Sequence, residues 1–300
     1  MRKFILCLSL LMTTTAMMAI PAKRGLWKTL RLTDGSEVRA QLRGDEHVHF
    51  WQTEDGRKLT ACGESFVVAS DKQLQVRALK RRASLKKAPT AGPRRVEMGE
   101  RTHYIGKKKG LVILVQYTDV KFKSANNLAK YKRILNEEGY TTSEGFKGSV
   151  ADYFKAQSRG LFELDFDVVG PYTMAADGEV NFADYDWDGD GEVDQVFVLY
   201  AGTGEADSYD DDAIWPHMYN LSYTDRDLYL DNTHIDTYAC SNEVDMSGSI
   251  EGIGCFCHEF SHCMGFPDFY DTSYSGFFGM SEFDLMDSGS YNGDGFVPAG

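Results

Sequence analysis

The pattern of apolar and polar residues divides the chain into a β-rich part, a basic break and a longer mixed part. Between residues 26 and 79, short stretches of alternating apolar and polar residues are separated by Asp-Gly and Gly-Asp pairs, a pattern typical of short strands joined by turns. From Lys80 to Arg95 apolar residues nearly disappear. We therefore predict a β-rich pro-region over 20–79 and an exposed basic linker over 80–108.

After this linker, strand-like and helix-like patterns alternate along the chain. Apolar runs rich in β-branched residues predict buried strands, and apolar residues three or four positions apart predict helices. The predicted strands are Leu111–Gln116, Phe162–Val168 and Val193–Ala201, and the predicted helices are 126–138, 148–158 and Ile253–Met264. Interleaved strands and helices predict an α/β or α+β main domain.

The N-terminus has the pattern of a secretory signal peptide. Two basic residues precede an apolar run from Phe4 to Met12, and small or polar residues follow. We predict a leader over 1–19, with cleavage after Ala19 and Ala22 as second choice, and hence a secreted or periplasmic protein. A membrane anchor is the alternative, but the threonine cluster cuts the apolar run well below the roughly 20 residues of a span. We expect no membrane span after leader cleavage.

Composition and charge narrow the function classes. The 300 residues are 42% hydrophobic and carry a formal charge of −13, which argues for a folded chain and against nucleic acid as a partner. From Lys72 to Lys109, 13 basic residues face two acidic ones, and from Asp177 to Glu251, 20 acidic residues face one arginine. Such self-repulsion favours bound divalent cations in the acidic part. The exposed basic linker is the predicted target of an activating protease.

The strongest chemical signal is the HExxH pattern of His258, Glu259 and His262. On a helix, the spacing of four residues puts both imidazoles on one face, where a single zinc ion can bind both. Glu259 lies beside the first ligand and can reach a water on the metal. Zinc held there would act as a Lewis acid and lower the pKa of that water, while Glu259 takes the proton and passes it to the leaving amine.

A third ligand is expected just after the helix. Gly265 tolerates a positive φ and lets the chain turn sharply at the helix end. This turn would bring Asp268 back to the metal. Two imidazoles and one carboxylate leave a fourth position open for water, as in a hydrolytic rather than a structural zinc site.

These segments together resemble the immune inhibitor A family of secreted zinc metallopeptidases, in the metzincin group. The resemblance rests on HEFSHCMGFPDFYD around the two histidines, on the upstream IWPH at Ile214–His217 and on the downstream SEFDLMDSGSYNG. It extends to KGLVILVQYTDVKF at Lys109–Phe122, to SVADYFKAQSRG and to FDVVGPYTM. It therefore covers about residues 109–300.

The resemblance implies a metzincin-like zincin domain over 109–300, with a mixed sheet and an active-site helix, that cleaves peptide bonds in proteins or peptides. The basic linker then suggests a zymogen. Because metzincins need a further C-terminal subdomain, we expect the domain to be incomplete at Gly300. The implied roles are zinc ligand for His258, His262 and Asp268, general base and acid for Glu259, and the methionine of the turn beneath the metal for Met286.

A second acidic pattern, DxDxDGxxD, predicts a structural calcium site. Its oxygen ligands would occupy positions 1, 3, 5 and 9 around a tight turn at Gly191. Position 12 is Phe197 instead of the bidentate glutamate of an EF-hand, so we predict a different type of calcium loop. An acidic surface turn is the alternative reading. The predicted ligands are Asp186, Asp188, Asp190, Asp194 and Glu192, the last through its backbone carbonyl.

Several other residues allow more than one interpretation. His217 is expected to be a buried structural histidine rather than part of a cleft, and Tyr291 is a minor candidate for stabilising an oxyanion. Cys62 is a minor candidate for an inhibitory thiolate on the zinc. The cysteines near the zinc histidines are expected to be small buried apolar residues, or to form one disulfide among themselves and Cys240. The alternative function is a calcium-dependent adhesin or binding module with an inactive zinc site, which intact Glu259 argues against.

Overall fold

The computed structural model describes residues 19–45, 48–85, 104–173, 180–208, 212–224, 227–272 and 278–300. The predicted leader, apart from Ala19, and most of the predicted linker lie outside these ranges. Among the described residues, no helix combines the length and apolar character that crossing a bilayer requires.

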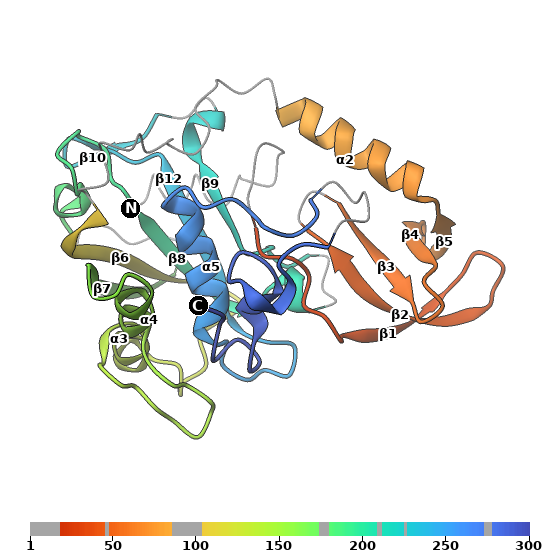
Figure 1. The fold of residues 1–300 in the computed structure, drawn as a ribbon, viewed down its shortest axis with the longest axis horizontal. Helices are drawn as coiled ribbons and strands as arrows, with labels where there is room; N and C mark the ends of the chain where they lie inside the picture. Colours follow the sequence, from red (N-terminus) through yellow and green to blue (C-terminus); the bar gives the residue numbers. More distant parts are fainter. Residues whose placement is uncertain are drawn as a thin grey trace.

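The N-terminal part of the chain forms an antiparallel sheet with one helix (Figure 1). Its five strands follow chain order, which is the arrangement produced by successive hairpins. They are β1 (Trp27–Arg31), β2 (Glu37–Gly44), β3 (His49–Thr53), β4 (Lys58–Cys62) and β5 (Ser65–Ala69). Helix α2 (Asp71–Leu85) places Leu74 and Ala78 in a small apolar cluster with Val48, Phe50 and Ala69. The predicted β-rich character of this part is therefore present in the structure.

Both ends of the predicted linker lie in regular secondary structure. Helix α2 continues to Leu85, because the basic residues that begin the predicted linker are also good helix formers. At the other end, β6 already begins at Gly106, since its lysines pair with β7 at the edge of the main sheet. The prediction of a linker over 80–108 was thus wrong at both ends.

The main sheet contains five strands in the order β7-β6-β8-β12-β9. Strands β7, β6, β8 and β12 run parallel, and β9 is antiparallel to β12, so the sheet is mixed as predicted. The strands are β6 (Gly106–Gln116), β7 (Phe162–Thr173), β8 (Val196–Thr203), β9 (His217–Asn220) and β12 (Thr237–Val244), and a separate hairpin consists of β10 (Tyr229–Leu230) and β11 (Thr233–His234).

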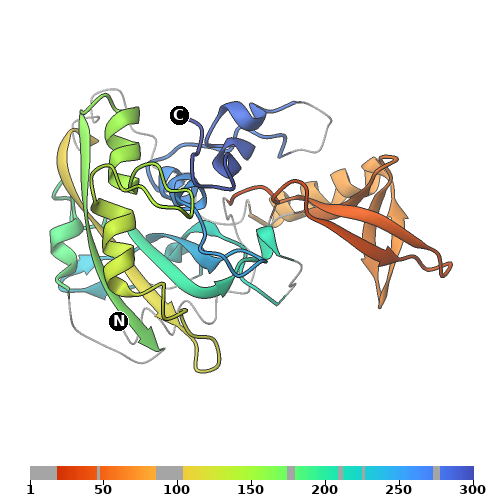
Figure 2. The same cartoon turned by 90° about the horizontal axis from the view of Figure 1, so that it is seen from below.

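Alternate residues of the central strands feed two separate apolar cores. On one face, Val112 and Leu114 pack with residues from three helices, α3 (Leu128–Asn136), α4 (Val150–Gln157) and α5 (Ile253–Cys263). Figure 2 shows α3 and α4 stacked along one side of the sheet. On the other face, Leu111 and Ile113 pack against loops and short elements. Both faces of the sheet are thus buried, which explains why its strands read as continuous apolar runs.

The helices begin where the sequence places capping residues. Ser149 and Asp152 form a reciprocal capping box at the start of α4, and Asn127 caps α3. All three predicted helices of the main part are present, with ends within about three residues of those expected. Short 3₁₀ helices connect the larger elements: η2 (Phe182–Tyr185), η3 (Glu205–Asp207), η4 (Leu221–Thr224), η5 (Ser281–Phe283) and η6 (Ser288–Tyr291).

The segment 19–23 leaves the N-terminal sheet and enters the main part of the protein. Ala22 N–H donates to the carbonyl of Gly44 in β2, and Lys23 N–H donates to the carbonyl of Ala206 in η3. Ala19 and Ile20 are fully buried against residues of the main part such as Trp215. This segment is therefore the physical link between the N-terminal sheet and the site described next (Figure 2).

Candidate metal centre

Helix α5 carries the HExxH residues through the centre of the molecule. Ten of its eleven residues are buried. Its first turn packs tightly because a Cβ on Gly254 would lie 1.8 Å from the carbonyl oxygen of Ser290, and one on Gly252 would lie 2.2 Å from the carbonyl carbon of Gly295. Glycine at these two positions lets the segment after Met286 pack directly on the helix. The backbone of α5 is thereby fixed.

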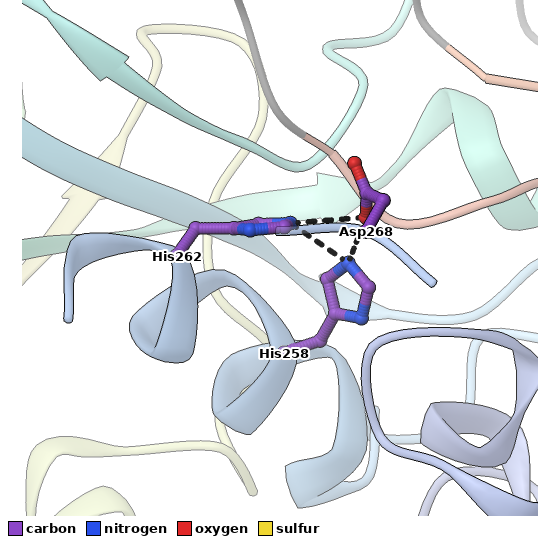
Figure 3. Close-up of side chains that lie close together, drawn as sticks. All are labelled: His258, His262 and Asp268. Atoms are coloured by element: carbon purple, nitrogen blue, oxygen red, sulfur yellow. Dashed lines mark hydrogen bonds and ion pairs between the residues drawn. The ribbon is translucent and has the colours of Figure 1, made fainter. Parts of the chain in front are cut away.

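Both histidines present the same ring nitrogen to the site. His258 Nδ1 lies 2.7 Å from the carbonyl oxygen of Leu285, and His262 Nδ1 lies 2.7 Å from that of Phe266. Because a carbonyl only accepts, each Nδ1 carries the proton and each Nε2 holds a lone pair. The two Nε2 atoms lie 3.1 Å apart (Figure 3). Such carbonyl contacts are the usual support for imidazoles that bind metal.

Asp268 completes a triangle of atoms that could bind a metal ion. Gly265 has φ +90° and ends the helix as predicted, and the chain returns so that Asp268 Oδ1 lies 3.3 Å from His258 Nε2 and 3.2 Å from His262 Nε2. In a tetrahedral zinc site with ligands at about 2.0–2.1 Å, neighbouring ligand atoms are about 3.3 Å apart. The triangle in Figure 3 therefore has the dimensions of a three-ligand zinc site.

The chemistry of these three groups also fits a cation. Both histidines are fully buried, and Asp268 Oδ1 is a buried oxygen without a hydrogen-bond donor among the described residues. Three lone pairs thus face one another, which repels unless a positive charge lies between them. Burial lowers the pKa of His258. Burial raises the pKa of the Asp268 carboxyl, and positive charge on the facing side lowers it.

Glu259 lies beside the triangle and contacts the N-terminal segment. Its side chain is fully buried, and Oε1 accepts a hydrogen bond of 2.7 Å from the backbone N–H of Ile20. Oε2 has no hydrogen-bond partner within the described part of the chain. Burial raises the pKa of this carboxyl well above its usual range, the Ile20 N–H opposes this rise, and the charge of Asp268 adds to it.

Three side chains hold the backbone of the N-terminal segment. Tyr270 OH donates to the carbonyl of Ala19, Trp215 Nε1 to that of Ile20, and Tyr291 OH to that of Pro21, each at 2.8 Å. Three successive carbonyls are therefore bound by donors from three different parts of the main body. Such contacts read the backbone of an extended peptide and not its sequence.

The sequence did not identify this set of donors. For Tyr291 the sequence suggests only the stabilisation of an oxyanion, and it suggests no role for Trp215 or Tyr270. Trp215 does lie within the IWPH segment, which is the one signal that pointed towards it.

His217 binds the backbone of Trp215. It is buried, its Nδ1 donates to the carbonyl of Trp215 at 2.7 Å, and its Nε2 lies 2.9 Å from Tyr238 OH. Burial lowers the pKa of His217 to about 4, so the ring is neutral at pH 7. The expected burial of His217 is confirmed. The histidine also positions Trp215, which binds the carbonyl of Ile20. His49, from the N-terminal sheet, stacks on Trp215 with ring centroids 5.4 Å apart.

Met286 lies under the site, within the turn that supports His258. Its N–H donates to Asp284 and its carbonyl accepts from Phe269 N–H, so the turn is tied to the chain that follows Asp268. The side chain of Met286 is buried and lines an apolar cavity of about 770 Å³ beside α5.

The acidic loop is arranged differently from the metal centre. Carboxylate oxygens of Asp186, Asp188 and Asp194 lie within 4.8 Å of one another. Asp190 Oδ1 instead accepts the N–H of Glu192. Val193 is fully buried and a strand follows the loop, both as expected.

The side chain of Glu192 faces away from this group. Its carboxylate lies 3.0 Å from His234 Nδ1, because the backbone at Glu192 pairs with β11 and directs the side chain to that histidine. The structure thus brings together three of the four predicted carboxylates. The predicted ligand atom of Glu192 is its backbone carbonyl, which the direction of its side chain does not test.

The cysteines form no disulfide within the described part of the chain. Cys240, Cys255 and Cys257 are buried, Cys263 is partly buried, and Cys62 is exposed in the N-terminal sheet. Of the two predictions for the cysteines near the histidines, small apolar packing is therefore correct. Ile20, and not Cys62, lies at the candidate site.

Comparison with known proteins now decides the family. The model of the immune inhibitor A peptidase M6 catalytic domain matches residues 149–298, which is half of the chain and includes every residue of the triangle. The chain belongs to the M6 peptidases. This family consists of metallopeptidases, which agrees with the resemblance seen in the sequence.

Two relatives are similar over parts of this M6 chain. Immune inhibitor A of Bacillus thuringiensis subsp. alesti is 24% identical over 239 residues, covering 57% of this chain and 34% of the relative. The pre-pro-metalloprotease PrtV of Vibrio cholerae is 30% identical over 143 residues, covering 40% of this chain and 15% of the relative. The chain thus spans about a third or less of the length of these relatives.

Proposed function

We propose that this protein is an exported zinc endopeptidase, made as a zymogen whose N-terminal segment blocks the active site. The observation that carries this proposal is the convergence of three metal-binding atoms beside a buried glutamate. The M6 membership supports the reaction class, and the spacing of the triangle supports zinc. We further propose that the main part has the metzincin arrangement, because the turn at Met286 underlies the histidines.

The roles of the residues follow from their positions. His258, His262 and Asp268 would hold the metal, which supplies a Lewis acid for the scissile carbonyl and lowers the pKa of the attacking water. Glu259 would accept the proton of that water and deliver it to the nitrogen of the departing amine. Leu285 and Phe266 would keep both imidazoles oriented through their carbonyls.

The contact between Ile20 and Glu259 supports the proposal that the N-terminal segment keeps the zymogen inactive. Since Glu259 serves the leaving nitrogen, the backbone nitrogen bound to it marks where that nitrogen would lie. The segment 19–23 therefore follows the path of a substrate, with Ile20 as the first residue after the reactive position. Leader removal after Ala19 would make Ile20 the first residue and leave no peptide bond across Glu259, so residues 20–23 would inhibit without being cleaved. Proteolysis in the basic linker would then release the block.

The variant Glu259→Gln tests this function directly. It keeps the shape of the side chain and removes its basicity, so it should abolish casein cleavage after activation by trypsin while zinc content stays near one per chain. Glu138→Gln, in an exposed turn after α3, is the matched control and should cleave normally. An adhesin with an inactive site would show no Glu259-dependent cleavage in the wild type, which would contradict the proposal.

A further inference from the structure

We propose that Asp207 and Glu251 form a subsite for a lysine or arginine side chain of the substrate, at the fourth position after the cleaved bond. The inference rests on the proposed function, because the segment 19–23 marks the path of the substrate only if it blocks the active site. It adds a chemical preference that the metal centre itself does not supply.

Lys23 defines the position of this subsite. It is the fourth residue when Ile20 is counted as the first, and its backbone N–H donates to the carbonyl of Ala206, next to Asp207. Its side chain is partly buried, with the ammonium 5.8 Å from the ring centroid of Tyr291. A lysine is thus directed into the main body at this point and not into solvent.

The two carboxyls are buried and incompletely satisfied. Asp207 is 4% exposed and Glu251 is 9% exposed. Asn242 donates to Asp207 Oδ2 at 3.4 Å, whereas Asp207 Oδ1 and Glu251 Oε2 have no donor group among the described residues. Two carboxyls in contact need a shared proton, which leaves the pair with about one negative charge.

The charge of Lys23 acts on both members of this pair. Burial raises the pKa of Glu251 well above its usual range and also raises that of Asp207, while the ammonium of Lys23 lowers both. A buried negative charge is costly without a compensating cation. When the pro-segment leaves, this cation leaves with it, so a substrate that brings a basic side chain to the same position would be favoured over one that does not.

Tyr291, which lies beside Lys23, suits the aliphatic part and the charged end of a basic side chain. Tyr291 binds the carbonyl of Pro21 through its hydroxyl and offers its ring face to the ammonium. An aromatic face attracts a cation, and this attraction holds for arginine as well as lysine. The same residue therefore fixes the peptide backbone and contributes to side-chain selection.

Hydrogen exchange on the intact chain tests the pocket without any need for activity. Lys23→Met should speed exchange of the amides at positions 22 and 23 by at least about ten-fold, because the attraction between the Lys23 ammonium and the carboxyl pair is lost. Lys23→Arg should restore slow exchange. Arg24→Met is the matched control, since Arg24 is exposed and its side chain donates to Ser281 Oγ at 3.3 Å. Equal exchange in Lys23→Met and wild type would overturn the proposal.

A pair of peptide substrates then tests selectivity in the activated enzyme. The peptides differ only in lysine or norleucine at the fourth position after the cleaved bond, and kcat/KM should be at least about ten-fold higher for lysine. Asp207→Asn and Glu251→Gln should remove this preference while Glu138→Gln keeps it. Equal rates for both peptides in the wild type would overturn the subsite. If neither peptide nor casein is cleaved, the proposed function fails, and the exchange experiment still decides whether the pocket binds the cation.

Discussion

The metal centre and the acidic loop were both recognised from regular spacing of ligand residues, yet the structure treats them in opposite ways. His258 and His262 are fully buried and each is fixed by a backbone carbonyl. The loop lies at the surface, and its carboxylates mainly accept N–H groups of their own turn, as Asp186 does from Gly189 and Gly191. Buried, supported ligands are pre-organised for chemistry, whereas an exposed loop of this kind suits structural binding.

The largest expected effect comes from removing one ligand of the buried centre. Asp268→Asn leaves two imidazoles and a neutral oxygen, so zinc content should fall and casein cleavage should drop by at least about 100-fold. The matched change in the loop, Asp188→Asn, should leave cleavage within about two-fold. Zinc analysis and initial rates check both. Equal losses in the two variants would show that the loop also serves catalysis.

The second effect concerns calcium in the loop. We propose that Asp186, Asp188 and Asp194 bind calcium, since their oxygens converge around a turn that needs the positive φ of Gly191. At about 100 times the Kd, a bound ion stabilises by about 2.7 kcal/mol, so removing calcium with zinc retained should lower Tm by several degrees. The variant Asp186→Asn should lose this shift. An unchanged Tm in the wild type would remove calcium from the loop.

Acid should weaken the buried region in a defined pH range. The folded pKa of His217 is about 4, below its unfolded value of 6.5. The unfolded chain therefore binds more protons between these values, and this contribution to stability is complete above pH 6.5 and falls as the pH approaches 4. The loss would be about 3 kcal/mol. Urea unfolding of wild type and His217→Phe at pH 7 and 4.5 should show a smaller decrease in the variant.

The smallest effect is expected at Glu192. Because its carboxylate pairs with His234 at a partly exposed site, Glu192→Gln should change the free energy of unfolding by less than about 1 kcal/mol. Calcium stoichiometry, measured by calorimetry, should stay the same. A clear loss of calcium binding would instead show that the carboxylate of Glu192, and not only its backbone carbonyl, contributes to the site.

Local patterns predicted much of the main part of the fold. The strands from β6 to β8 and the helices α3, α4 and α5 lie close to their expected ranges, because apolar periodicity and caps are local signals. The predicted linker failed at its start, where α2 extends to Leu85. Basic residues are compatible with a helix as well as with a linker, so composition alone could not place this boundary.

The candidate sites also combine features that local sequence predicts with features that it does not. A helix carries residues four positions apart on one face, and a glycine turn returns the next carboxylate, so His258, His262 and Asp268 converge by geometry that the sequence alone contains. The side-chain direction of Glu192 was set by β-pairing with a distant segment, which the spacing of the loop did not encode.

By itself, the sequence indicated the family, the three residues that converge in the structure and the neighbouring glutamate, since all of these depend on short-range spacing. Only the tertiary structure decided that the N-terminal segment contacts this site. Ile20 meets Glu259 across 239 positions of chain, and Pro21 meets Tyr291 across 270. Contacts of that range follow from how separately folded layers pack together, and no local pattern of residues specifies them.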